Sequence, residues 1–301
     1  MLIQYLHYKF LFLSLSSLII CSNTYFSNWG NYSINNQSYS INNQEIINVL
    51  ENHINHMNSK FYSIRKSPFE IIISNQHNSL SSNKIWDWSL GVTLNNSIII
   101  KDISKTHISK KRIMQVLRHE LNHLYLNRLV DKSYLPRWFE EGFAMYYANE
   151  NLISNKFILA KNINNQHMFN LEILNNQFNS HSKKQFNFAY AYSQFLFLDL
   201  INNYSEEIII NIILDVKSGY IFDDAFYKNT LLTVSDYNKK ASKAIYLKFW
   251  WFKFMKLPSL LLILAPLLSI VGFIIVKIKN KKIIKKWDIE EKLDFEDEAK
   301  V

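Results

Sequence analysis

The feature that most constrains this chain is the segment His119-Glu120-Leu121-Asn122-His123, an HExxH motif. Residues 109–130 around it contain neither Gly nor Pro and follow helical periodicity, which predicts a helix through the motif. Side chains four positions apart on a helix lie on one face, separated by about 40° around the axis. His119 and His123 can therefore reach one metal ion, while Glu120 lies beside that face.

The residue types in this motif predict a particular metal chemistry. Two imidazoles and an open coordination position suit Zn²⁺ best, although they do not exclude other divalent ions. Glu120 cannot easily bind the same ion, but it can accept a proton from a water molecule that the ion activates. We therefore expect His119 and His123 as ligands and Glu120 as general base. The competing interpretation is a pair of ordinary histidines on a helix surface.

A catalytic zinc site takes three protein ligands, so a third ligand is expected further along the chain. Residues 135–142, LPRWFEEG, offer two adjacent acids, Glu140 and Glu141. Pro136 favours the start of a second helix, which could return antiparallel to the first. Glu141 is the preferred ligand because it precedes Gly142, whose lack of a side chain would allow close helix packing. Glu140 would then lie behind the metal or face solvent.

Residues 118–124, RHELNHL, and residues 135–144, LPRWFEEGFA, together resemble the peptidase MA-like family of gluzincins. The similarity extends less specifically over residues 60–240. It implies a zincin-like domain with an N-terminal mixed β-sheet, an active-site helix and a C-terminal helical part. It also implies zinc-dependent hydrolysis of peptide bonds, with a peptide or protein as substrate.

The same resemblance implies how substrate and transition state are bound. In gluzincins an extended peptide pairs with the strand before the active-site helix, which here would fall within residues 86–94. A tyrosine or histidine usually stabilises the oxyanion, and Tyr190 lies in the matching segment, with Tyr192 as a competitor. Both tyrosines could instead be aromatic residues of the core. The Gly-x-Met-Glu-Asn strand of related aminopeptidases is absent around Gly91, which favours an endopeptidase.

The order of sequence patterns predicts an α+β domain over residues 45–248. Residues 69–73 have the apolar character of a buried strand. Residues 86–94 and 97–101 are also β-rich, and Asn95-Asn96 between them favours a hairpin. Helical periodicity dominates after residue 108.

The N-terminal residues have a different character. The apolar run at residues 11–20 follows Lys9, so residues 1–21 are expected to be a signal peptide, with an uncleaved N-terminal anchor as the alternative. Cys21 resembles the cysteine of a lipoprotein signal, but Ile20 is large for that motif. Residues 22–44 contain the hexapeptide YSINNQ twice, which favours a disordered low-complexity spacer.

The C-terminal residues predict attachment to a membrane. Residues 257–276 carry no charge and follow an aromatic cluster, so residues 249–276 are expected to form an aromatic belt and a transmembrane helix. A buried core helix is the alternative. Six lysines follow within residues 277–286, which by the positive-inside rule makes residues 277–301 a cytoplasmic tail that is first basic and then acidic.

Together these patterns predict a single-pass membrane-anchored zinc metallopeptidase, an endopeptidase whose domain lies on the periplasmic or extracellular side. The net charge of +9 owes much to the lysines of residues 277–286, so no nucleic-acid partner is expected. A lipid bilayer and a peptide substrate are the expected partners. The alternative from another class is a catalytically inactive protein of zincin fold that captures an extended segment as a scaffold.

Overall fold

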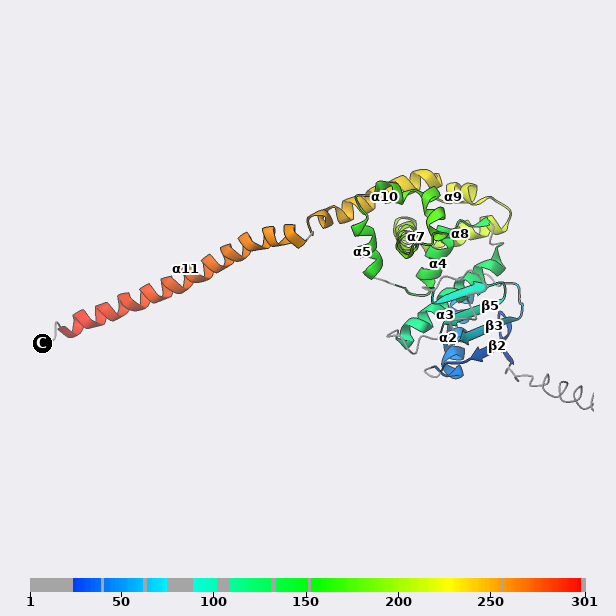
Figure 1. Cartoon of the computed structure of the whole chain (residues 1–301), viewed down its shortest axis with the longest axis horizontal. Coiled ribbons are helices and arrows are strands. Elements are labelled where there is room, and N and C mark those ends of the chain that lie inside the picture. Colours follow the sequence, from blue (N-terminus) through cyan, green and yellow to red (C-terminus); the bar gives the residue numbers. More distant parts are fainter. Residues whose placement is uncertain are drawn as a thin grey trace, which may run out of the picture. The chain divides into compact units, whose positions relative to one another are not determined.

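The computed structural model describes residues 24–38, 41–61, 64–74, 89–101, 109–130, 134–150, 153–255 and 257–298. The chain divides into two compact units, Met1–Ile245 and Tyr246–Val301. The signal peptide or anchor expected at residues 1–21 lies outside the described residues. Within the first unit, all five strands precede the helices from residue 110 onwards, and only one described helix comes between strands, which agrees with the α+β prediction (Figure 1).

A five-stranded mixed sheet forms the N-terminal part of the first unit, in the order β1-β2-β3-β5-β4. Its strands are β1 (Thr24–Ser27), β2 (Gly30–Asn36), β3 (Phe69–Ser74), β4 (Gly91–Leu94) and β5 (Ser97–Lys101). The three inner strands are parallel to one another, whereas β1 and β4 at the two edges run antiparallel to their neighbours. The mixed sheet expected from the family resemblance is therefore present.

The prediction of a disordered spacer at residues 22–44 is wrong for the part that the structure describes. Residues 32–36 of the first YSINNQ copy lie in β2, where Tyr32 and Ile34 are both buried because side chains two positions apart on a strand point to the same face. The described residues of the second copy, 41–44, instead lead into a helix. Asn42 caps α2 (Asn43–Lys60) in a reciprocal pair with Glu45. The described residues of the two copies thus adopt different structures, because their partners in the fold differ.

The hairpin predicted around Asn95-Asn96 is confirmed. Strands β4 and β5 pair antiparallel with Leu94 opposite Ser97, and Asn95 has the positive φ of 52° that such a turn uses. Residues 86–88 of the predicted first strand lie outside the described residues. Strand β4 lies at one edge of the sheet that the described residues form.

The predicted helix through the HExxH motif is α3 (Lys110–Leu129), and Ser109 caps its first turn by accepting from the N–H of Arg112. Leu117, Leu121 and Leu124 are completely or almost completely buried, which anchors the helix in the core as expected. Helix α4 (Arg137–Tyr147) begins directly after Pro136.

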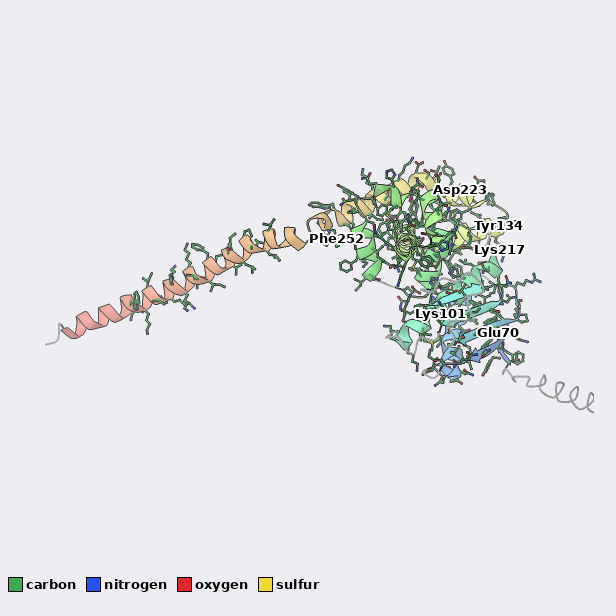
Figure 2. All side chains as sticks on the ribbon, in the orientation of Figure 1. Glu70, Lys101, Tyr134, Lys217, Asp223 and Phe252 are labelled. Carbon is green, nitrogen blue, oxygen red and sulfur yellow. The ribbon has the colours of Figure 1, made fainter. Side chains whose placement is uncertain are left out.

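The rest of the first unit is helical. It contains α5 (Ile153–Lys161), η4 (Gln166–Phe169), α6 (Leu171–Phe178), α7 (Lys183–Tyr204), α8 (Glu206–Lys217), α9 (Phe222–Thr230) and most of α10 (Val234–Phe249). Buried aromatic side chains such as Trp138, Phe139 and Phe143 fill this part, where side chains are densely packed (Figure 2). A Cβ on Gly142 would lie 2.5 Å from Cβ of Phe197, so this glycine permits the close packing of α4 on α7.

The second unit contains the short helix η5 (Trp250–Met255) and the long helix α11 (Leu257–Glu298). The uncharged residues 257–276 and the charged residues after them belong to this one helix of 42 residues. Among the residues that the structure describes, no helix combines the length and the apolar character needed to cross a membrane. The predicted transmembrane helix is therefore not supported.

Candidate metal centre

The three side chains predicted as metal ligands lie together. His119 and His123 come from neighbouring turns of α3, and their Nε2 atoms are 3.1 Å apart. Oε2 of Glu141, on α4, is 3.4 Å from Nε2 of His119 and 3.5 Å from Nε2 of His123. Glu140 is buried, so the alternative in which it faces solvent is excluded.

The spacing of these atoms fits a tetrahedral metal ion. Ligands that each lie about 2.0–2.1 Å from a zinc ion are about 3.3 Å from one another in a tetrahedron. The ligand atoms of His119, His123 and Glu141 lie 3.1–3.5 Å from one another, which is close to this spacing. Oε2 of Glu141 is also buried without a hydrogen-bond partner among the described residues, a costly arrangement that a cation would relieve. The donor set therefore suits Zn²⁺.

The electrostatics of the cluster favour a positive charge between the ligands. Burial lowers the pKa of His119, but the carboxylates of Glu150 and Glu141 more than offset it and raise this pKa well above its usual value. Burial raises the pKa of Glu141, yet His123 and His119 hold it well below its usual range. The groups that stabilise a proton on the imidazole would equally stabilise a cation bound there.

A cavity of about 320 Å³ adjoins the cluster. Glu120, the predicted general base, lines it together with His119. Oε2 of Glu120 accepts a hydrogen bond of 2.8 Å from the hydroxyl of Thr93 on β4. A Cβ on Gly91 would lie 2.9 Å from Oε1 of Glu120, so the edge strand and the base are in close contact.

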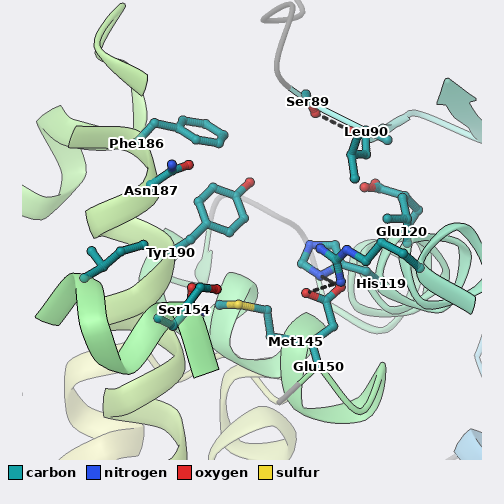
Figure 3. Close-up of a pocket in the computed structure, with 15 residues that line it drawn as sticks. Ser89, Leu90, His119, Glu120, Met145, Glu150, Ser154, Phe186, Asn187 and Tyr190 are labelled. Carbon is teal, nitrogen blue, oxygen red and sulfur yellow. Dashed lines mark hydrogen bonds and ion pairs between the residues drawn. The ribbon is translucent and has the colours of Figure 1, made fainter. Parts of the chain in front are cut away.

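Of the two candidate tyrosines, Tyr190 is at the site. It enters the cavity from α7, opposite His119 and Glu120 (Figure 3), and its hydroxyl donates to Oε1 of Glu141 over 3.1 Å. Burial, followed by the charge of Glu141, raises the pKa of Tyr190 well above its usual value, so the hydroxyl keeps its proton. The hydroxyl of Tyr192 is engaged elsewhere, because it donates to Oδ1 of Asn238 over 2.6 Å.

A model of the peptidase MA superfamily matches residues 51–246, more than half of this 301-residue chain. The matched region contains the HExxH motif, Glu141 and Tyr190. The chain belongs to the peptidase MA superfamily. The sequence matches no curated protein.

Membership of the peptidase MA superfamily confirms the family expected from the two motifs and supports a peptidase-type enzyme. The matched region begins within α2, so β1 and β2 precede it. The sheet of this superfamily member therefore continues into a segment that the family model does not cover.

Two further residues at the site were not identified from the sequence. Oε1 of Glu150 lies 3.4 Å from Nδ1 of His119, and Oε2 of Glu150 lies 3.0 Å from Nη1 of Arg112. Arg112 precedes His119 by two helical turns on α3, so helical periodicity could have indicated that the two side chains share one face of this helix. Glu150 lies beyond the end of α4, outside any helix, so helical periodicity in the sequence could not indicate that it reaches the site.

The variable position Asn122 of the motif joins three helices. Its amide nitrogen donates to the carbonyl oxygen of Ala144 on α4 over 3.0 Å. Its Oδ1 lies 2.7 Å from Nε2 of His53 on α2, and both side chains are buried. Because an amide oxygen only accepts, Nε2 of His53 carries the hydrogen. Asn122 thereby fixes α3, between the two histidine ligands, to α2 and α4.

Proposed function

We propose that the chain is a zinc-dependent metallopeptidase that cleaves internal peptide bonds. The observation that carries the proposal is the convergence of Nε2 of His119, Nε2 of His123 and Oε2 of Glu141, which lie 3.1, 3.4 and 3.5 Å from one another. The same cavity is lined by Glu120 and Tyr190, and the chain belongs to the peptidase MA superfamily.

Each side chain has a role that follows from its position. When bound by His119, His123 and Glu141, zinc would act as a Lewis acid that polarises a carbonyl and makes water more acidic. Glu120 takes the proton of the attacking water and passes it to the leaving amine. Since Oε2 of Glu120 already accepts from Thr93, we assign the transfer to Oε1.

Tyr190 is suited to stabilise the negative charge that develops on the substrate carbonyl. Its buried hydroxyl stays protonated and now donates to Glu141, which is itself in the ligand cluster. A rotation of the O–H bond redirects the hydrogen towards a neighbouring oxyanion. A donor that is already positioned before the reaction needs little reorganisation, which is why such groups accelerate acyl transfer.

The edge strand supports an endopeptidase. Strand β4 pairs with β5 on one side, and no strand in the described part of the chain pairs with its other side. An extended peptide can add to this open edge, beside Glu120. A substrate peptide that pairs with β4 can extend past both ends of this strand. Binding therefore does not require a free N- or C-terminus of the substrate near the site.

Metal content and turnover of the full-length protein test this proposal. We expect about one zinc per chain in the wild type, loss of zinc in His123→Ala and Glu141→Ala, and retention of zinc without turnover in Glu120→Gln. Peptide libraries read by mass spectrometry would report internal cleavage. Zinc binding with no cleavage of any peptide would contradict the peptidase and favour the scaffold that captures an extended segment.

We also propose that the domain works outside the cytoplasmic membrane. Support comes from the apolar run of residues 11–20 after Lys9, which has the composition of an export signal. Cell fractionation together with N-terminal sequencing of the mature protein tests this. A protein that retains Met1 and fractionates with cytoplasmic markers would contradict the proposal.

A further inference from the structure

A line of three side chains leads away from the proposed ligand His119. Nδ1 of His119 lies 3.4 Å from Oε1 of Glu150 (Figure 3). The other carboxylate oxygen of Glu150 lies 3.0 Å from Nη1 of Arg112. We propose that Glu150 is a positioning residue that orients His119 for zinc, and that Arg112 holds Glu150 in place. The inference rests on the proposed zinc site and assigns roles to two residues outside the ligand set.

The second nitrogen of a ligating imidazole needs a hydrogen-bond acceptor. Nε2 of His119 faces His123 and Glu141, so the ring hydrogen belongs on Nδ1 when Nε2 binds a cation. Nδ1 is buried and makes no hydrogen bond to the described residues, and its contact with Glu150 is slightly longer than an ordinary hydrogen bond. A small rotation of the carboxylate would let it accept this hydrogen, which fixes both ring orientation and tautomer.

The backbone of Glu150 is held in a way that suits this role. Its N–H donates to the carbonyl of Met145 over 2.9 Å, and its own carbonyl accepts from the side chain of Gln194 on α7. Asn149, with a φ of 56°, turns the chain out of α4 immediately before it. With only 4% of its side chain exposed, Glu150 therefore presents its carboxylate to α3 from a fixed position.

Arg112 explains how a third carboxylate can be buried beside Glu120 and Glu141. A buried negative charge without a counterion is strongly destabilising, more so beside other negative charges. The Arg112 guanidinium supplies that counterion from α3, the helix that also carries His119. The ion pair thus ties the end of α4 to α3 on the opposite side of His119 from the metal ligands.

A purely structural ion pair would behave differently from a positioning residue. Loss of a structural pair lowers the stability of the metal-free protein and leaves the zinc affinity of the folded fraction unchanged. Loss of a positioning carboxylate lowers zinc affinity in a protein that still folds. Outer carboxylates of this kind typically contribute about 10–100-fold to metal affinity.

The experiment is a zinc titration of the metal-free full-length protein against a competing chelator, with thermal unfolding of the same samples. The variants are Glu150→Gln, Glu150→Asp and Arg112→Gln, with Glu172→Gln, an exposed acid on α6, as matched control. We expect zinc affinity to fall by about 10–100-fold in Glu150→Gln, by less in Glu150→Asp and Arg112→Gln, and not at all in the control.

The outcomes separate this inference from the proposed function. If the wild type binds no zinc, the zinc site itself fails, and the inference fails with it. If the wild type binds one zinc and folded Glu150→Gln binds it equally tightly, only the positioning role is overturned. Should Glu150→Gln fail to fold, Glu150→Asp decides, because it keeps the charge but withdraws the carboxylate from His119; wild-type zinc affinity there overturns the inference.

Discussion

Thr93 on the edge strand β4 is hydrogen-bonded to Glu120 on α3. The Thr93 hydroxyl lies 2.8 Å from Oε2 and 2.9 Å from the backbone carbonyl oxygen of Glu120. Both residues are buried, so water cannot replace this contact at little cost. The strand that we propose for substrate binding therefore also orients the proposed general base.

Replacing Thr93 by Val should lower turnover while zinc remains bound. Val keeps the branched shape but removes the donor, which leaves Oε2 of Glu120 without its hydrogen bond and the carboxylate free to rotate. We expect kcat to fall about 10-fold with KM little changed. Steady-state cleavage of one peptide and zinc content would be measured together. Thr93→Ser restores a hydroxyl and should recover most of the rate; equal activity of Val and wild type would refute the role.

Replacing Gly91 by Ala should also impair Glu120, the proposed general base, but through a steric clash and not through the loss of a hydrogen bond. A Cβ here would lie 2.7 Å from Cγ1 of Val116 and 2.9 Å from Oε1 of Glu120, so side chains must shift. Overpacking of this kind costs about 1–3 kcal/mol of stability. We expect a lower kcat and unchanged zinc stoichiometry, measured by turnover and metal analysis. Gly272→Ala is the control, since a Cβ there meets nothing within 4 Å.

Tyr190→Phe should separate transition-state stabilisation from metal binding. The variant loses the hydroxyl that donates to Glu141 but keeps all three ligands, so zinc content should be retained while kcat falls about 10–100-fold. Tyr192→Phe is the matched control because its hydroxyl is bonded to Asn238, away from the ligands. It should lose about 1 kcal/mol of stability with normal kinetics. Similar kinetics of the two variants would argue against Tyr190 as the oxyanion donor.

The local parts of the site could be predicted from the sequence because they depend on helical geometry alone. The separation of His119 and His123 fixes their common face in any helix, and Pro136 with Gly142 marks where the second helix begins and how closely it packs. Glu150 could not be predicted in this way. Its carboxylate reaches His119 through a turn at Asn149 and contacts from other helices, which depend on tertiary packing.

The strands β1 and β2 could not be predicted from the sequence either, because the sequence there indicates disorder whereas the structure has strands. The composition of residues 22–44 indicates disorder, because few apolar residues are available to offset the entropy of folding. Strand β3 supplies part of what the segment lacks, since Tyr32 stacks on Phe69 at a ring-centroid distance of 5.3 Å, in addition to stacking on Tyr25 within the segment. Partners on β3 are remote in sequence, so no local pattern identifies them.

The burial of His53 predicts a specific pH dependence of stability. Burial, aided by the nearby charges of Arg118 and His56, lowers the pKa of His53 to about 4, although the hydrogen bond to Asn122 opposes this. In the unfolded chain the pKa returns to about 6.5. Between these values the unfolded state binds more protons, so the free energy of unfolding decreases as the pH falls, by up to roughly 3 kcal/mol.

Urea unfolding of the metal-free protein at pH 7 and pH 4.5 would measure this contribution, with zinc removed so that its loss in acid does not interfere. The His53→Gln variant cannot gain a proton at this position, so its stability should fall less than that of the wild type over the same interval. His167→Gln, an exposed histidine in η4 that is not among the charges acting on His53, is the control and should behave like the wild type. If His53→Gln and wild type lose equal stability, His53 is not held neutral in the folded protein.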